Sequence, residues 1–180
     1  MWLEILRNMI SKKQAIKPPK SIQTSPDKII ETFSPGKKMN RIFSKSLRVR
    51  QVDAGSCNAC EWECTALTNP IYDIQRFGID FVASPRHADV LLVTGPVSRQ
   101  MELALKKTYL TMPEPKLVIA CGDCAINGGV YKGSYATREG ASSVIPVNSR
   151  VSGCPPTPAT IIKGLLKLMK IIRSYSKVKK

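Results

Sequence analysis

Five short apolar segments lie between residues 47 and 148, most of them bounded by glycine or proline, as buried β-strands are. They are LRVRQVD, FGIDFVA, ADVLLVTG, KLVIACG and the weaker SSVIPVN. Residues 99–110 have helical spacing instead, and the MPEP sequence after them ends that helix. Strands that alternate with helices along the chain predict an α/β fold built on a doubly wound parallel sheet.

The most clearly defined helix lies near the carboxyl end. Thr157 is suited to cap it, and Pro158 suits its first turn. Its apolar residues share one face and its lysines share the other. The apolar face consists of Ile161, Ile162, Leu165, Leu166, Met169 and Ile172, and the basic face of Lys163, Lys167 and Lys170.

Length and composition indicate one domain. The chain has 180 residues, of which 43% are hydrophobic and 23% are charged, and this excludes wholesale disorder. We place the domain at residues 47–173, after a basic arm at 1–46 and before a basic tail at 174–180. Residues 1–10 of the arm have the spacing of a short amphipathic helix, and the rest of the irregular arm is rich in Lys, Ser and Pro, like a linker.

The sequence contains no recognisable membrane or export signal. No stretch approaches the roughly 20 apolar residues that span a bilayer. The first ten residues, MWLEILRNMI, lack a basic start and a small-residue cleavage site, unlike a signal peptide. We therefore expect a soluble chain that faces the cytosol.

Positive charge is concentrated at the two ends. Residues 1–50 carry 12 Lys and Arg against three acids, residues 51–160 carry nine against 10, and residues 161–180 carry seven and no acid. A nucleic-acid-binding domain carries its basic residues on the folded surface, so we predict no nucleic-acid partner. The basic ends are interpreted either as solubilising segments or as attractors of an anionic lipid surface or an acidic partner.

Five of the six cysteines lie where predicted strands end or a helix begins. Cys57 and Cys60 follow the first strand, Cys121 and Cys124 lie at the end of a later one, and Cys154 precedes the last helix. Loops at the carboxyl ends of parallel strands converge on one crevice, where thiols distant in sequence can meet. Nothing indicates secretion, so disulfides are not expected. A thioredoxin-type CxxC motif would not be accompanied by a second pair.

Four thiolates that meet at one point indicate a metal site. Zinc and an iron–sulfur cluster are both compatible with such ligands. The 60 residues between Cys60 and Cys121 far exceed the roughly 15–20 that separate the CxxC pairs of a zinc ribbon. Nearby glycines can bring backbone N–H groups close to sulfur, which is how the potential of an iron–sulfur cluster is tuned. These features favour iron–sulfur and leave zinc as the alternative.

Four motifs, DAGSCNACEWE, SPRHADVLLVTG, IACGDCAINGG and SGCPPTP, follow one another at wide spacing. Over residues 47–170 the chain resembles the small, cluster-bearing subunit of group 4 membrane-bound nickel–iron hydrogenases, the formate hydrogenlyase type. The superfamily includes the 20 kDa (B) subunit of complex I. The resemblance implies a flavodoxin-like α/β fold that holds one 4Fe–4S cluster through Cys57, Cys60, Cys124 and Cys154.

The remaining cysteines fall outside that ligand set. Cys121 ends a buried strand, which favours a small core side chain. Cys64 lies one helical turn after Cys60, where it could pack beneath the cluster. Ala59 stands where the hydrogenase pattern usually has glycine.

The resemblance also implies a role. The chain would transfer electrons, as a subunit of an oxidoreductase, between the nickel–iron site of a large partner subunit and a further iron–sulfur subunit. The complex would include integral membrane subunits, with this chain peripheral on the cytoplasmic side, and catalysis would belong to the partner. Alternatives are a complex I 20 kDa-type subunit of an NADH:quinone oxidoreductase, a related ion-pumping complex without nickel, and a zinc-stabilised binding module.

Other residues near the motifs have both a functional and a structural interpretation. Glu61 could relay protons or contact a partner, or be an acid at a helix start. His87 could bond near the cluster or a quinone-like ligand, or orient its loop. Arg86 could offset cluster charge or pair with Asp89. Turn or close-approach roles are expected for Asp53, Asp123, Gly128 and Gly129.

Overall fold

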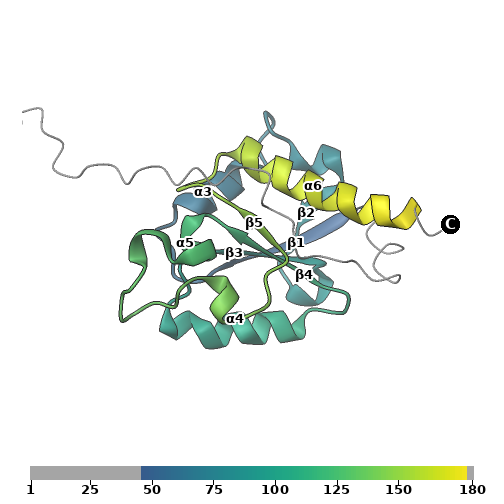
Figure 1. Cartoon of the computed structure of the whole chain (residues 1–180). Helices are drawn as coiled ribbons and strands as arrows, with labels where there is room; N and C mark the ends of the chain where they lie inside the picture. Colours follow the sequence, from purple (N-terminus) through teal and green to yellow (C-terminus); the bar gives the residue numbers. More distant parts are fainter. Residues whose placement is uncertain (1–45, 178–180) are drawn as a thin grey trace, which may run out of the picture.

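Five parallel strands form one sheet in the computed structural model, which describes residues 46–177 (Figure 1). The predicted amphipathic helix, nearly all of the arm and the end of the basic tail lie outside the described residues. The strands are β1 (Leu47–Asp53), β2 (Ile79–Phe81), β3 (Val90–Thr94), β4 (Leu117–Cys121) and β5 (Ser149–Val151). Their order is β2-β1-β3-β4-β5, and every neighbouring pair is parallel. The predicted α/β class is confirmed.

Helices cover both faces of the sheet (Figure 1). On one face lie α3 (Ala59–Ala66) and α6 (Pro158–Lys177), and on the other lie α4 (Arg99–Thr111) and α5 (Asp123–Asn127). Side chains alternate along β3, so that Leu92 belongs to the α3–α6 core while Leu91 and Val93 belong to the α4–α5 core. Both faces are therefore buried, which explains the nearly continuous apolar runs of β3 and β4.

One predicted strand is displaced. Residues 142–148 were expected to form the last strand, but the strand begins only at Ser149, and Ala141–Ser143 form a 3-10 turn instead. Pro146 cannot donate a ladder hydrogen bond, so the apolar residues around it pack without entering the sheet. Asn148 starts the pairing, because its side chain accepts the Val118 N–H at 2.8 Å.

The carboxyl-terminal helix packs as predicted. The Thr157 hydroxyl accepts the Thr160 N–H at 3.4 Å, in the role of a helix cap. Of the predicted apolar face, Ile161, Ile162, Leu165 and Met169 are buried, and Leu166 is partly buried. Lys163 and Lys170 are exposed. The side chain of Ile172 lies outside the described residues.

Replacing Leu165 with alanine should destabilise the domain strongly. Leu165 is fully buried between α6 and the sheet, and truncating such a leucine costs about 2–5 kcal/mol in the free energy of unfolding. Lys163→Ala, two residues earlier on the exposed face, should change it by less than about 0.5 kcal/mol. Urea unfolding midpoints of the two variants check this, and equal midpoints would contradict the packing of α6.

No helix within residues 46–177 is both long and apolar enough to cross a membrane.

The parallel sheet places the cysteine-bearing loops at one edge. β1 ends at Asp53 before Cys57, β4 ends at Cys121 before Cys124, and β5 ends at Val151 before Cys154. Because β1, β4 and β5 all run in the same direction, their carboxyl ends and the loops that follow them meet at the same edge.

Candidate metal centre

Four thiols from three loops converge at this edge of the sheet. Cys60 and Cys124 are each 8% exposed, whereas Cys57 and Cys154 are exposed. Cys57 lies in the loop after β1 and Cys60 in the first turn of α3, while Cys124 lies in α5 and Cys154 in the loop before α6. The site therefore has two buried thiols and two at its outer rim.

The pKa of Cys60 shows that these thiols lie close together. Burial raises it from 9.0 to about 12, and the negative charges of Glu61, Cys64, Cys124 and Cys57 add to the shift, in that order. A buried thiol surrounded by other potential anions keeps its proton unless a cationic group compensates the charge. Cys60 would therefore keep its proton until a bound metal compensates the charge of its thiolate.

Cys124 lies near Cys154, the fourth thiol of the group. The pKa of Cys124 is raised by burial first and then by the charge of Cys154, with smaller contributions from Cys57 and Asp123. The backbone N–H of Val130 donates a hydrogen bond to this sulfur and acts in the opposite direction. Hydrogen bonds from backbone N–H to sulfur are one means by which proteins stabilise thiolate ligands.

Two glycines leave room for the buried sulfurs. A Cβ on Gly122 would lie 2.7 Å from the Cys60 Sγ, and a Cβ on Gly129 would lie 2.9 Å from the Cys124 Sγ. Both residues have positive φ angles, +89° and +50°. Side chains at these positions are excluded by backbone conformation and by space. The close approach expected of Gly129 is confirmed.

Hydrogen bonds join the loops to one another. Asp123 donates its N–H to the Gly153 carbonyl at 3.0 Å and accepts the Gly153 N–H at 2.9 Å, which ties the Cys124 segment to the Cys154 loop. Asp53 accepts the N–H groups of Gly55 and Ser56, both at 2.8 Å, and so closes the turn before Cys57. The structural roles predicted for both aspartates are confirmed.

One carboxylate oxygen of Glu61 accepts a hydrogen bond at the site, and the other accepts none within residues 46–177. The Ser56 hydroxyl donates to its Oε2 at 2.6 Å. Its Oε1 is buried, with no hydrogen-bond partner within residues 46–177. This side chain therefore contributes negative charge beside Cys60 and retains an acceptor for a further donor. The role of Ser56 was missed, although its place three residues after Asp53 is typical of a turn.

Two predicted neighbours lie elsewhere. His87 and Arg86 belong to the 3-10 turn Pro85–His87 that precedes β3, at the opposite edge of the sheet from the cysteine loops. The interpretations of His87 as a ligand neighbour and of Arg86 as a balance for cluster charge are therefore wrong. Within residues 46–177 Arg86 forms no ion pair with Asp89, which accepts the Arg48 N–H at 2.9 Å instead.

Cys64 and Cys121 lie in the core, as expected of Cys121. Their exposed fractions are 1% and 0%. What the sequence did not predict is that the two thiols share one core, where the neighbouring Cys64 and then burial raise the pKa of Cys121. The sequence indicated only weakly that they are neighbours, because Cys121 ends a strand and Cys64 lies one helical turn after Cys60.

The thiol group differs from a site for a single ion. Within residues 46–177, no three His, Cys, Asp or Glu side chains are arranged to hold one metal ion. A mononuclear zinc site brings its ligands to within about 2.0–2.3 Å of one point.

The chain is thus an α/β protein whose parallel sheet carries a group of thiols at its carboxyl edge. Residues 57–168 match the family described as NADH ubiquinone oxidoreductase, 20 Kd subunit. This match covers more than half of the chain, and its first residue is Cys57. The chain therefore belongs to this family of oxidoreductase subunits, as the motifs indicated.

Similar proteins come from both archaea and bacteria. The chain is 44% identical over 137 residues to a probable membrane-bound hydrogenase subunit, MbhJ, of Pyrococcus furiosus, with 74% of this chain and 82% of that protein covered. It is 42% identical over 122 residues to formate hydrogenlyase subunit 7 of Escherichia coli, covering 68% of this chain and 48% of that protein. It thus spans about half of the latter.

Solved structures show the same fold. A chain of the membrane-bound sulfane sulfur reductase, an archaeal respiratory membrane complex, matches with a TM-score of 0.66 and 36% identity, with 76% of each chain covered. A chain of an NAD+-reducing [NiFe]-hydrogenase matches with a TM-score of 0.54 and 18% identity, covering 69% of this chain and 92% of that one. The second likeness concerns the fold alone.

Proposed function

We propose that this chain is the electron-transfer subunit of a membrane-associated hydrogenase complex and holds one 4Fe–4S cluster beside the nickel–iron site of a large partner subunit. The observation that carries the proposal is the convergence of four thiols from three loops at one edge of the sheet. The proposed ligands are Cys57, Cys60, Cys124 and Cys154.

The residues present suit such a group chemically. Thiolates are the usual ligands of iron–sulfur clusters, and when bound a cluster accepts and gives up single electrons. Val130 donates its N–H to the Cys124 sulfur, and Gly122 and Gly129 admit the buried sulfurs at close range. Glu61 places a carboxylate beside Cys60, and added negative charge favours the more oxidised state of a nearby redox centre.

Burial divides the four proposed ligands into an inner and an outer pair. Cys60 and Cys124 face the interior of the domain, and the exposed Cys57 and Cys154 face outward. The outer pair leaves one side of the group open to the surface of this chain. Electron transfer to another subunit requires a short path, so we assign this open side to the large partner subunit.

Exposed apolar side chains adjoin the same loops. Trp62, two residues after Cys60, is 71% exposed, Val130 is 72% exposed and Tyr135 is 87% exposed. Aromatic side chains are enriched in protein interfaces. These residues support docking of the large subunit over the thiols. A further iron–sulfur subunit and integral membrane subunits complete the proposed complex, with this chain peripheral on the cytoplasmic side.

A second function is favoured by a specific likeness. The match to a chain of the sulfane sulfur reductase, at 36% identity, extends over three quarters of this protein. The alternative function is therefore that of the same type of subunit in another respiratory membrane complex, or of a complex I 20 kDa-type subunit of an NADH:quinone oxidoreductase; we infer that such a complex would contain no nickel.

The metal content of the intact complex distinguishes these functions. We expect the complex, purified anaerobically from membranes through a tag on this subunit, to contain about one nickel per copy of this chain. The chain alone should be brown and contain about four iron atoms and four acid-labile sulfides. Iron without nickel would contradict the hydrogenase proposal in favour of the alternatives, and stoichiometric zinc in a colourless chain would contradict the cluster.

A further inference from the structure

A loop beside the candidate metal centre connects a proposed ligand to α4. Residues 128–138 (the 128–138 loop) follow α5 and end against the residues that precede α4. A Cβ on Gly129, at the start of this loop, would lie 2.9 Å from the Cys124 Sγ. At the other end, Arg138 donates its backbone N–H to the Val97 carbonyl at 2.8 Å. The loop therefore lies against a proposed ligand at one end and against the start of α4 at the other.

An ion pair fastens the end of this loop to α4. The Arg138 side chain donates from Nε to Oε2 of Glu102 at 2.8 Å, and its Nη2 lies 2.8 Å from the same oxygen. The other carboxylate oxygen of Glu102 accepts from Lys106, one helical turn further along α4, at 2.7 Å. Only the first of these two ion pairs joins α4 to the loop, because the second lies within the helix.

Hydrogen bonds inside the loop connect its two ends. The Thr137 hydroxyl, next to Arg138 in the sequence, donates to the Tyr131 carbonyl at 3.1 Å. The Lys132 N–H in turn donates to the Gly129 carbonyl at 3.3 Å. Because the end, the middle and the start of the loop are joined in this way, fixing Arg138 also restricts the movement of Gly129.

The outer part of the loop lies in solvent, although its start covers a buried sulfur. Val130 and Tyr135 are exposed, whereas Cys124 is buried. A loop with an exposed outer part opens locally when the bonds at its ends break, and the rest of the domain need not unfold. Movement of Gly129 away from the Cys124 sulfur would open this ligand to water and to solutes.

We propose that Glu102 and Arg138 are positioning residues for the candidate metal centre, because their ion pair keeps the 128–138 loop closed over the Cys124 sulfur and so limits the access of solutes to the bound group. The proposal rests on the proposed function in one respect, namely that Cys124 is a ligand. Closure of the loop itself does not depend on that function.

The expected effect is moderate, because both partners are partly solvated. The side chains of Arg138 and Glu102 are 42% and 20% exposed. Removing an ion pair at such a position should increase the opening of the loop by about two- to fivefold. It should not unfold the domain, whose two cores lie against the sheet.

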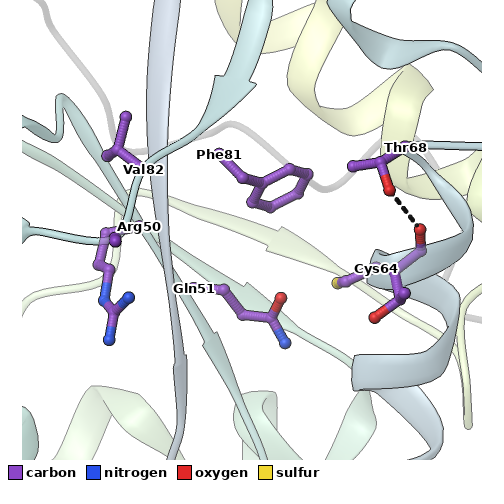
Figure 2. Close-up of a pocket in the computed structure, with 8 residues that line it drawn as sticks. Arg50, Gln51, Cys64, Thr68, Phe81 and Val82 are labelled. Atoms are coloured by element: carbon purple, nitrogen blue, oxygen red, sulfur yellow. Dashed lines mark hydrogen bonds between the residues drawn. The ribbon is translucent and has the colours of Figure 1, made fainter.

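A cavity on the other face of the sheet offers a competing route into the domain. It has a volume of about 340 Å³ and lies between α3 and the edge of the sheet formed by β1 and β2 (Figure 2). Figure 2 shows the Cys64 side chain directed from α3 toward the sheet, across from Gln51 and Phe81. Thr68 belongs to the α3 side of the wall. The test must therefore distinguish entry past the 128–138 loop from entry through this cavity.

The test uses the full chain, purified anaerobically with its cluster, and measures two rates. Hydrogen exchange followed by mass spectrometry reports the opening of the loop, and the release of iron to bathophenanthroline disulfonate reports access to the bound group. In Arg138→Met and in Glu102→Gln, both the exchange of peptides covering 128–138 and the release of iron should be about two- to fivefold faster. Exchange of β3 peptides should not change.

Salt and two further variants show whether the ion pair is the cause. In about 1 M KCl, where the Debye length is about 3 Å, the wild-type rates should approach those of Arg138→Met. Arg138→Lys keeps the positive charge and should restore most of the closure. Lys106→Met is the matched control, because it removes the other cation from Glu102 and leaves the loop attached. Both of its rates should equal those of the wild type.

Several results would overturn the proposal. Unchanged loop exchange in Arg138→Met would show that the ion pair does not close the loop, and faster exchange without faster iron release would show that closure does not protect the group. Equal acceleration in Lys106→Met would attribute the effect to the charge of α4. If Thr68→Trp, which narrows the cavity, slows iron release while Arg138→Met leaves it unchanged, solutes enter through the cavity. A colourless chain would contradict the proposed function, and loop exchange would still decide whether the ion pair closes the loop.

Discussion

Replacing Cys124 with serine should abolish the visible absorbance and the EPR signal of the proposed cluster, whereas Cys121→Ser should preserve both. Cys124 interacts with Cys154 and Cys57 across the candidate metal centre, so its loss removes one of four thiolates. A serine hydroxyl is a far poorer ligand for iron than a thiolate. Cys121 is fully buried and belongs instead to the core cluster that contains Cys64.

The two cysteines form a matched pair because they lie only three positions apart in the sequence. Both belong to the segment at the end of β4, so a general disturbance of this segment would affect both variants alike. The urea midpoint of each variant reports such a disturbance independently of colour. Loss of the cluster in Cys121→Ser, together with its retention in Cys124→Ser, would show that the ligand assignment is wrong.

The strands were predictable where one apolar pattern extended through the whole element. β1 coincides with the predicted segment at residues 47–53, and β3 and β4 fall within theirs. β5 was missed because its residues, Ser149, Arg150 and Val151, are not an apolar run, and hydrogen bonds to β4 rather than hydrophobicity define it. α5 was missed because its five residues are too few to show a helical period.

The sequence predicted which loops form the candidate site, but it did not predict which side chains lie beside one another there. Parallel strands bring Cys57, Cys124 and Cys154 to one edge whatever the details of packing. That Cys64 and Cys121 share one core depends on how α3 packs on the sheet, which no spacing in the sequence encodes. For His87 the sequence predicted a neighbour of the site that the fold does not provide. His87 belongs to one of the four motifs, yet it lies at the other edge of the sheet from the cysteine loops.

The loops also hold one another in place through backbone positions that residue types alone do not reveal. Asp123 and Gly153 exchange two hydrogen bonds, and Gly122 lies against the Cys60 sulfur although 62 positions separate them in the sequence. The position of the Cys60 sulfur thus depends on a glycine in another loop. The positions of the sulfur atoms therefore depend on the space that neighbouring loops leave for them as well as on the cysteines.

Gly122→Ala should therefore remove most of the cluster, although it changes no ligand. The new Cβ would lie 2.7 Å from the Cys60 Sγ, a separation that real Cβ contacts do not show, so the thiol must move away from its place in the group. The backbone at Gly122, with φ +89°, adds strain of about 1–3 kcal/mol for any side chain. Iron and sulfide content per chain, with absorbance, measures the loss.

Gly133→Ala separates these two causes. Gly133 has a similar φ of +80°, but a Cβ there would meet no atom within 4 Å, so this variant has the backbone strain without the contact with sulfur. It should keep its iron and its colour. Equal losses in both variants would mean that strain, and not the approach to Cys60, governs the site. Full iron content in Gly122→Ala would mean that the Cys60 sulfur has other positions from which to bind, and that the close fit around it is not needed to hold the cluster.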